Sequence, residues 1–256
     1  MNKSSQPEPI SYIERLSNNV DQYIESVIDY PDVRLNEFLA LQSYANLNSP
    51  QRLLEVPAEG KMLELLYPMA NIDRADFLKL HLSNYAENVM LTNWDLDGIA
   101  ADTYDALLAV VPFHHANAKE KQCYVTGAWQ ALKPGGVLAI AEVAEDSPEH
   151  HFLDGFINAH TASGHCGAYP TQAFTQVLLN HGFTDVSTTM LACPWIFHSE
   201  AELHTYLTRL FGLTTMSVET LIAALEICPG LQRKDGRIVM SWSLRYFRGV
   251  KRAHGI

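Results

Sequence analysis

The chain has 256 residues, of which 47% are apolar and 18% are charged, and this composition is typical of soluble globular proteins with one substantial core. A net charge of −11 without a basic face argues against nucleic-acid binding, and no apolar run approaches the roughly 18 residues of a membrane span. The polar residues 1–10 do not resemble a signal peptide, and four cysteines without a Cys-x-x-Cys pair indicate free thiols in a cytoplasmic protein.

The first elements in chain order are predicted helices. Apolar residues recur at helical spacing from residue 10 to residue 28, and a second helical pattern runs from Pro31 to about residue 46. We interpret residues 1–48 as an N-terminal tail and helical cap, followed by a single α/β domain over residues 49–256.

The α/β domain alternates short apolar runs with helical stretches, the pattern of β-α-β units around a parallel sheet. Helices are predicted over 120–132 and 171–181, and Gly182 follows the second of them as a typical C-terminal cap. Seven strands are predicted, over 52–56, 70–73, 88–92, 104–111, 136–143, 184–191 and 237–247.

Two segments stand apart from this alternation. Residues 146–170 combine glycines with aromatic side chains, which predicts a mobile lid over a site. Residues 199–231 predict a helical insertion before the last strand, with Ser199 as the cap of its first helix. Together with Pro194, Trp195 and Phe197, this insertion either covers an apolar or aromatic acceptor or only seals the core.

Three motifs occur in an order that belongs to a known family. Leu132-Lys133-Pro134-Gly135-Gly136 leads into the fifth predicted strand, His114 and His115 follow the fourth, and Gly182-Phe183 leads into the sixth. Together they resemble the class I S-adenosylmethionine (SAM)-dependent methyltransferases, in particular the type 11 or UbiE-like branch that acts on small molecules. The resemblance implies a Rossmann-like seven-stranded sheet whose last strand is antiparallel, with ligands over the carboxyl ends of the strands.

The resemblance also implies residues for the adenosine part of SAM. Asp73 is expected at the end of the second strand, as the acid that accepts the ribose hydroxyls, because one carboxylate can accept two hydroxyl hydrogen bonds. Asp95 is expected to bind the adenine amino group, with Trp94 or Leu96 beside the ring and Val111 at the end of the fourth strand. The alternative is that both acids only cap turns after strands.

The glycine-rich cofactor loop of this family is degenerate here. The family has an acid followed by glycines at three alternating positions; Glu55 matches the acid, but the glycine positions fall on Pro57, Glu59 and Lys61. Only Gly60 is recovered by a shift of one residue. Pro57 fixes φ and removes an N–H donor, whereas glycine lets the backbone approach a ligand closely.

Glu59 is the most unfavourable of these replacements, because it places an anion near the carboxylate of SAM. Two like charges about 4 Å apart cost on the order of 4 kcal/mol at an effective dielectric of about 20. That cost would weaken binding roughly a thousandfold. Compensation by Lys61, or an outward orientation of Glu59, would remove it.

Histidines supply the other candidate chemistry. His115, or failing that His114, is the predicted general base for a hydroxyl or thiol acceptor; the alternative is that both are structural residues at a strand end. The histidines and the cysteine of the predicted lid match no metal-ligand spacing, so no metal is predicted. These residues are His150, His151, His160, His165 and Cys166.

The sequence therefore predicts a SAM-dependent methyltransferase that acts on a small-molecule acceptor and has an atypical cofactor loop. The alternative is a pseudo-methyltransferase that no longer binds SAM normally and serves as a SAM-independent enzyme or as a non-catalytic partner protein. The sequence names neither the acceptor nor the oligomeric state, for which a homodimer is one candidate. Neither nucleic acid nor a membrane is expected as a partner.

Overall fold

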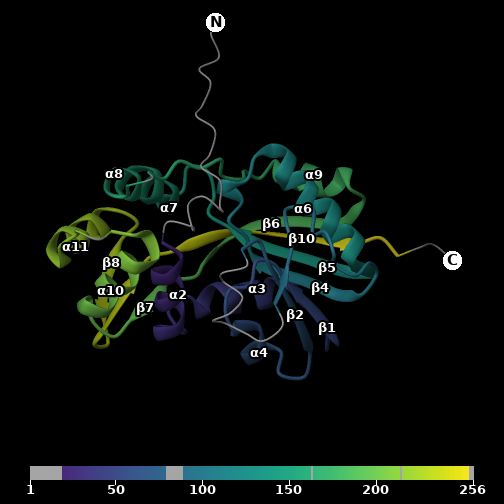
Figure 1. Ribbon diagram of the computed structural model, residues 1–256, viewed down its shortest axis with the longest axis horizontal. Helices are drawn as coiled ribbons and strands as arrows, with labels where there is room; N and C mark the ends of the chain where they lie inside the picture. Colours follow the sequence, from purple (N-terminus) through teal and green to yellow (C-terminus); the bar gives the residue numbers. More distant parts are fainter. Residues whose placement is uncertain (1–18, 79–88, 163, 214, 254–256) are drawn as a thin grey trace, which may run out of the picture.

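A twisted seven-stranded sheet forms the centre of the molecule (Figure 1). The computed structural model describes residues 19–78, 89–162, 164–213 and 215–253. The strand order is β3-β2-β1-β4-β5-β10-β6, and β10 alone runs antiparallel to its neighbours β5 and β6. The seven strands are β1 (Arg52–Glu55), β2 (Asn71–Asp76), β3 (Val89–Leu91), β4 (Tyr104–Val110), β5 (Leu132–Glu142), β6 (Phe183–Ala192) and β10 (Ser243–Lys251).

This topology confirms the predicted fold class, including the antiparallel last strand. The order of the strands reverses between β1 and β4, which are parallel neighbours although β2 and β3 lie between them in the chain. In open α/β sheets, ligands bind outside the carboxyl ends of the strands at such a reversal. A ligand-binding site is therefore expected where β1, β2, β4 and β5 end.

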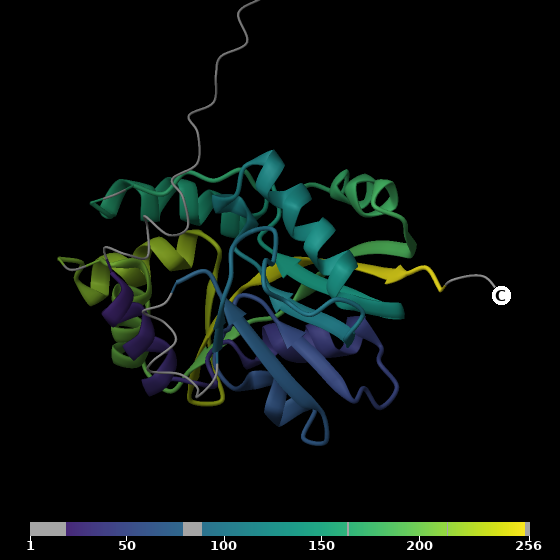
Figure 2. The ribbon, with the colours of Figure 1, turned by 45° about the vertical axis from the view of Figure 1, so that its right-hand side comes forward.

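Helices cover both faces of the sheet. Neighbouring strand residues face opposite sides: Leu53 packs in one core cluster with α3 and α4, whereas Leu54 packs in a second cluster with α6 and α9 (Figures 1 and 2). A capping box at Asn117 and Glu120 fixes the start of α6. These helices are α3 (Leu35–Ala45), α4 (Met62–Leu66), α6 (Ala118–Ala131) and α9 (Phe174–Asn180).

A second, smaller unit lies at one end of the sheet. It contains α10 (Glu200–Phe211), α11 (Val218–Ile227) and a three-stranded antiparallel sheet in the order β7-β9-β8. Its strands are β7 (Trp195–Phe197), β8 (Leu231–Lys234) and β9 (Arg237–Met240). The sequence predicted the two helices of this insertion but missed its sheet.

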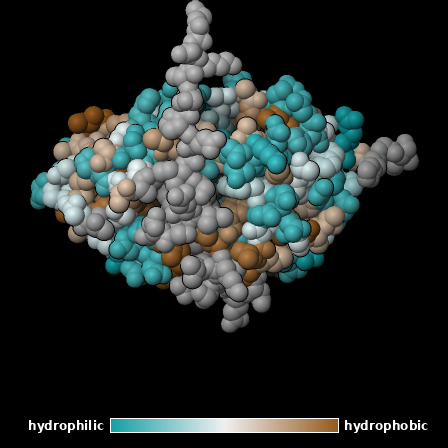
Figure 3. Space-filling model, turned by 45° about the horizontal axis from the view of Figure 1, so that its top comes forward, coloured by the Kyte–Doolittle hydropathy of each residue, from teal (hydrophilic) through white to brown (hydrophobic). Residues whose placement is uncertain are grey.

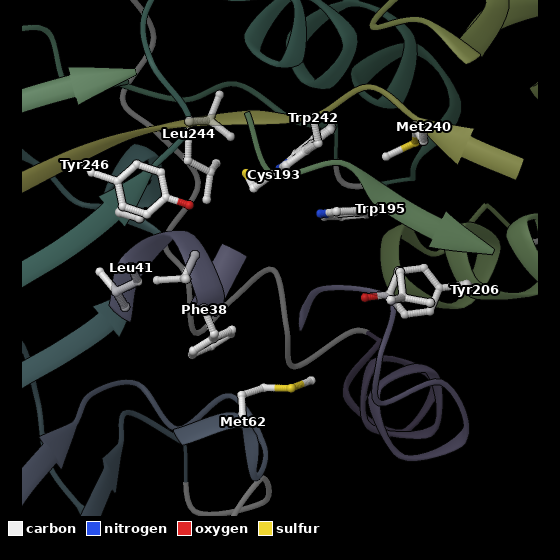
Figure 4. Packing of buried hydrophobic residues seen from close by; sticks show 14 of the residues in the cluster. Phe38, Leu41, Met62, Cys193, Trp195, Tyr206, Met240, Trp242, Leu244 and Tyr246 are labelled. Atoms are coloured by element: carbon white, nitrogen blue, oxygen red, sulfur yellow. The ribbon is translucent and has the colours of Figure 1, made fainter. Parts of the chain in front are cut away.

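The predicted last strand over 237–247 is wrong as one element. The structure divides it into β9, in the small sheet, and β10, in the large sheet. Trp242 lies at the break and packs against Trp195 of β7, with ring centroids 4.5 Å apart. Figure 4 shows these two rings side by side near Cys193 and Leu244, so the break closes the core between the two sheets.

The N-terminal helix joins this smaller unit. Helix α2 (Val20–Asp29) packs against α10, and Arg209 of α10 contacts Asp29 at 2.6 Å, while the Asn19 side chain donates to the Arg209 carbonyl at 2.6 Å. Helix α2 and the insertion thus form one wall (Figure 1). The part of the predicted N-terminal cap before residue 19 lies outside the described residues.

The predicted lid forms a helical segment followed by a return loop. Its helical part is continuous through α7 (Pro148–His151), the π-helical turn η2 (Phe152–Ile157) and α8 (Asn158–His160).

No helix in the described parts of the chain is long and apolar enough to cross a membrane. Figure 3 shows a face on which hydrophilic and hydrophobic residues are intermingled.

Candidate functional site

A cavity of about 140 Å³ lies between the carboxyl ends of β4 and β5 and the wall formed by α2 and the insertion. One side of the cavity is polar and the other is apolar and aromatic. The polar lining is Tyr23, Arg34, Glu37, Glu59, His114, His115, Glu142 and His165. The apolar lining is Val110, Val111, Pro112, Val143, Leu153, Trp195, Leu210, Phe211, Trp242 and Leu244.

The loop after β1 is held by buried charges. The Glu55 carboxylate is fully buried, accepts a hydrogen bond from Nε of Arg74 at 3.0 Å and is also the acceptor for the Glu59 N–H at 3.3 Å. Burial raises the pKa of Glu55, and Arg74 opposes this rise. Nε of Arg74 also contacts the Gly60 carbonyl at 3.1 Å, and Gly60 has a φ of 93°. Gly60 thus supplies the left-handed conformation within this loop.

Glu59 is compensated by the N-terminal part of the chain. Its carboxylate pairs with Arg34 at 2.7 Å and accepts a hydrogen bond from the Tyr23 hydroxyl at 3.0 Å. Glu37 contacts Arg34 at 2.8 Å, and the Glu37 carboxylate also accepts a hydrogen bond from the Trp195 indole at 2.8 Å. Burial opposes the charge of Arg34, but Glu37 and Glu59 hold its pKa well above the ordinary value.

Lys61, the compensating cation considered from the sequence, is exposed at the start of α4. The partner in the structure is Arg34, which lies 25 residues before Glu59 in the chain. The expected penalty for a lone anion therefore does not apply, because the Glu59 charge is already paired. No local pattern in the loop could have shown this contact.

The second strand extends three residues beyond its predicted end. Asp73 therefore lies within β2 and not at its carboxyl end. It pairs with Arg52 at 2.7 Å and accepts a hydrogen bond from the Tyr104 hydroxyl at 3.0 Å. Arg52 and Tyr104 are the first residues of β1 and β4, so Asp73 is directed to the opposite end of the sheet from the cavity. The placement of Asp73 at the strand end is wrong.

Asp76 occupies the carboxyl end of β2 instead. Its side chain is 1% exposed, and its Oδ1 accepts the Leu78 N–H at 3.1 Å. Its Oδ2 is buried and has no hydrogen-bond partner among the described residues. Burial raises the pKa of Asp76 to about 7; the backbone N–H groups of Leu78, Phe77 and Ala58 oppose this rise, and Glu59 adds to it. Sequence reasoning missed Asp76 because Arg74 and Asp76 interrupt the apolar pattern of the strand.

The segment after β3 forms a turn stabilised by its own side chains. The Asp95 N–H donates to the Asn93 side chain at 3.0 Å, and the Asp95 carboxylate accepts the Asp97 N–H at 3.0 Å. Asp95 is exposed, whereas Leu96 is buried with a φ of 57°. These contacts agree with the turn alternative for Asp95, and its role toward adenine stays a prediction.

Trp94 of this turn lies next to the end of β2. Its ring centroid is 4.5 Å from that of Phe77, the residue after Asp76, and 6.1 Å from that of Phe113. Val111 is fully buried and lines the cavity from the end of β4. The structure thus brings Trp94 against Phe77, and Val111 into the cavity that His114 and His115 also line.

His114 and His115 lie in a 3₁₀ turn, η1 (Phe113–His115), directly after β4. Nδ1 of His114 contacts Oε2 of Glu142 at 2.9 Å, and the His114 N–H donates to the same oxygen at 3.0 Å. The other Glu142 oxygen accepts the Val143 N–H at 2.6 Å. The His114 ring is stacked on the Tyr169 ring, with the ring centroids 5.0 Å apart and an angle of 7° between the ring planes. A buried carboxylate thus fixes the orientation of this imidazole.

His165 joins these two histidines from the predicted lid. One ring nitrogen from each of His114, His115 and His165 lies within 4.8 Å of the others, and all three residues are buried. Nδ1 of His165 contacts Asp154 at 3.2 Å, and the Asp154 carboxylate also accepts the Tyr169 hydroxyl at 2.6 Å. Partial burial would raise the pKa of Asp154, but its contacts with His165, Tyr169 and the Gly167 N–H hold it below the ordinary value.

The remaining histidines of the predicted lid have other contacts. His150 lies 3.5 Å from Asp154, His151 stacks on His150, and His160 contacts the Phe156 carbonyl at 2.8 Å. The Cys166 thiol is directed toward Asn158. Of the five residues that the sequence grouped together in this segment, only His165 belongs to the three-histidine cluster.

No protein-family model matches the chain, and no curated protein matches it. Solved structures do match. The cyclase SpnF superimposes with a TM-score of 0.61 at 12% identity, covering 98% of this chain and 100% of SpnF. A SAM-dependent methyltransferase from Thermotoga maritima gives a TM-score of 0.55 at 12% identity, with 94% and 100% of the two chains covered.

A third match is a phosphoethanolamine N-methyltransferase from Haemonchus contortus in complex with S-adenosylhomocysteine. Its TM-score is 0.55 at 13% identity, and the superposition covers 96% of this chain and 61% of that protein. The chain has the class I methyltransferase fold. At these identities the similarity establishes the fold alone, so the activity has to be argued from the residues of the site.

In this fold, the strand order reverses between β1 and β4, and ligands bind outside the carboxyl ends of the strands at such a reversal. Burial is the main cause of the raised pKa values of Glu55 and of Asp76 at the end of β2, and Glu59 adds to both. The cavity continues from Glu59 toward the histidines that follow β4. The residues after β1, β4 and β5 thus line one cavity, whereas Asp76 at the end of β2 is not among its lining residues.

Proposed function

We propose that this chain is a SAM-dependent methyltransferase that acts on a small molecule bound in the cavity. The observation that carries the proposal is the Oδ2 atom of Asp76 at the carboxyl end of β2, a buried acceptor without a hydrogen-bond partner among the described residues. A buried polar atom without a partner costs about 1–3 kcal/mol. A ribose hydroxyl that donated to this atom would remove that cost, so the residue present fits the ribose of SAM.

The cavity also contains groups that suit the amino-acid end of SAM. Arg34 and Glu59 both line it; Glu59 is buried, and the Arg34 side chain is 13% exposed. A zwitterion would find a guanidinium for its carboxylate and a carboxylate for its ammonium group. Because Arg34 and Glu59 already pair with each other, the zwitterion would exchange one set of ion pairs for another, without leaving a charge unpaired.

The acceptor would lie on the aromatic side of the cavity, beside His114. Bound SAM would supply an electrophilic methyl group. The contact between Glu142 and Nδ1 favours the tautomer with the proton on Nδ1, which leaves Nε2 of His114 to accept a proton from a hydroxyl or thiol. This contact supports His114 as the base over His115, the residue preferred from the sequence. Trp195, Trp242 and Phe211 would exclude water and favour an apolar or aromatic acceptor.

Isothermal titration calorimetry with SAM and S-adenosylhomocysteine tests the proposal. We expect Asp76→Ala to weaken binding of both about 10- to 100-fold, the effect of losing a hydrogen bond to a charged group. The matched control is Asp73→Ala, which removes a carboxylate from the same strand but from the far end of the sheet, and should change affinity less than about threefold. Absence of binding to the wild-type chain at millimolar ligand would refute the proposal.

The second candidate is an enzyme with this fold that does not transfer a methyl group. It is favoured by the loop after β1, in which Glu59 is fixed by Arg34 and Tyr23 and glycine is largely absent. SpnF, which has the same fold, is described as a cyclase. Replacing Glu59 by glycine separates the candidates: if SAM binds only to Glu59→Gly and not to the wild type, the natural loop excludes the cofactor.

A further inference from the structure

We propose that His114, His115 and His165 bind a divalent transition-metal ion at the wall of the cavity. The three residues are 9%, 6% and 2% exposed, and one ring nitrogen of each lies within 4.8 Å of the others. Two nitrogen ligands of a tetrahedral zinc ion are about 3.3 Å apart, given bonds of about 2.0 Å. Small side-chain rotations that move the ring nitrogens by roughly 1–1.5 Å would therefore bring all three within bonding distance of one ion.

The carboxylates behind the cluster support a metal site. Glu142 contacts Nδ1 of His114 at 2.9 Å, and Asp154 contacts Nδ1 of His165 at 3.2 Å. Metal-binding histidines commonly donate one ring N–H to a carboxylate, which fixes the ring and makes the other nitrogen a better ligand. In both residues the carboxylate contacts Nδ1, so the same nitrogen, Nε2, would face the ion.

These carboxylates are themselves fixed in place. Asp154 accepts the Tyr169 hydroxyl at 2.6 Å and the Gly167 N–H at 3.2 Å, while Glu142 accepts two backbone N–H groups. The Tyr169 ring lies flat against His114. A hydrogen-bonded frame around two of three imidazoles limits the entropy that would be lost when the ion orders them.

The chemistry of the ligands selects the kind of ion. Three imidazole nitrogens suit zinc, cobalt or nickel, whereas magnesium and calcium prefer oxygen ligands. The charged groups that share the cavity are Arg34, Glu37 and Glu59, which are paired with one another, and Glu142, which contacts His114. Three protein ligands also leave a coordination position open toward the 140 Å³ cavity. This position would take a small ligand with an oxygen or thiolate donor.

The proposal does not depend on methyl transfer. With an ion bound, His114 would be a ligand, and the ion would lower the pKa of a bound hydroxyl in place of the imidazole base. Without an ion, His114 remains available as a base. Metal binding is measured in the absence of SAM, so its failure and the failure of the proposed methyl transfer are separate results.

The test uses the full chain after treatment with a chelator and dialysis. Titration with cobalt(II), followed by visible absorption, and with zinc, followed by calorimetry, should give one ion per chain with micromolar or tighter affinity. We expect His165→Gln and His115→Gln to weaken binding at least 100-fold. Asp154→Asn should weaken it about 10- to 100-fold, as is typical when the carboxylate partner of a ligand is lost.

The matched control is His160→Gln, which removes an exposed histidine from the same segment and should bind cobalt as the wild type does. Circular dichroism of the metal-free variants shows whether they remain folded. If the ligand variants do not fold, X-ray absorption of the zinc-loaded wild type decides, with about three nitrogen neighbours at about 2.0 Å expected. A wild type without stoichiometric binding, or ligand variants that bind equally tightly, would overturn the proposal.

Discussion

Asp76 should make the stability of the protein fall as pH rises. The ordinary pKa of an aspartate in an unfolded chain is about 3.9, and burial raises the pKa of Asp76 to about 7 in the folded protein. A group whose pKa is raised by folding stabilises the folded state below the unfolded pKa, and this contribution is lost as pH rises through the folded pKa. The window for Asp76 is therefore pH 4 to pH 7.

The expected magnitude follows from the two pKa values. A difference of about three in pKa, at about 1.36 kcal/mol for each, corresponds to about 4 kcal/mol between pH 4 and pH 8. The side chain is only 1% exposed, so solvent screening reduces this figure little. Asp76→Asn removes the titration but keeps an acceptor for the Leu78 N–H. Its free energy of unfolding, relative to wild type, should rise by about 4 kcal/mol across this range.

Urea unfolding of both proteins at intervals from pH 4 to pH 8 measures this difference. Titrations that both proteins share cancel in the comparison, and so does any constant cost of the amide. The reasoning fails if the difference is constant within about 1 kcal/mol over this range. In addition, a ligand whose hydroxyl donates to Asp76 would favour its ionised form. Binding of such a ligand near pH 6.5 should therefore release protons, seen as a binding enthalpy that depends on the buffer.

Three further predictions concern the rest of the site. Arg34→Met leaves Glu37 and Glu59 buried without their cation and should lower the free energy of unfolding, measured by urea titration, by about 3–5 kcal/mol. The control is Arg233→Met, which removes the cation of an exposed ion pair and should have little effect. His114→Gln should lower kcat about 10²- to 10⁴-fold while the calorimetric affinity for SAM changes less than about threefold; His181→Gln is the control, and an unchanged kcat would exclude His114 as the base. Gly127→Ala should reduce both stability and SAM affinity, because its Cβ would lie 2.3 Å from the Asp95 carbonyl, while Gly155→Ala, which has open space, should be tolerated.

The fold could be predicted because its signals are local. Alternation of apolar runs with helical stretches gave the order of the elements, and the family resemblance, carried in part by the turn at Leu132-Lys133-Pro134-Gly135-Gly136, implied the antiparallel last strand; the structure confirms both. The small sheet was missed although its turn carries a local signal. Asp235-Gly236 joins β8 to β9, and both residues have positive φ, as two-residue hairpin turns require.

The site was harder to predict because its contacts are distant in sequence. The apolar pattern of β2 stops at Arg74, whose buried charge pairs with Glu55 on the neighbouring strand and with Glu64 of α4. His165 meets His114 across about 50 residues of chain, and the sequence offered no reason to join them. Arg34 likewise reaches Glu59 from another part of the molecule. In each case a tertiary contact, and not a local pattern, determines the role of the residue.

The loop after β1 gains a structural meaning from these contacts. Glu59 binds Arg34, Arg34 binds Glu37, and Glu37 accepts the indole N–H of Trp195. This chain of buried contacts joins the cofactor loop to the helical cap and to the small sheet. A glycine at position 59 would leave Arg34 with one carboxylate fewer and would separate the loop from the cap. The residue that departs most from the family pattern, Glu59, therefore links this loop to the cap, and a ligand carboxylate that bound Arg34 would compete with Glu59 for it.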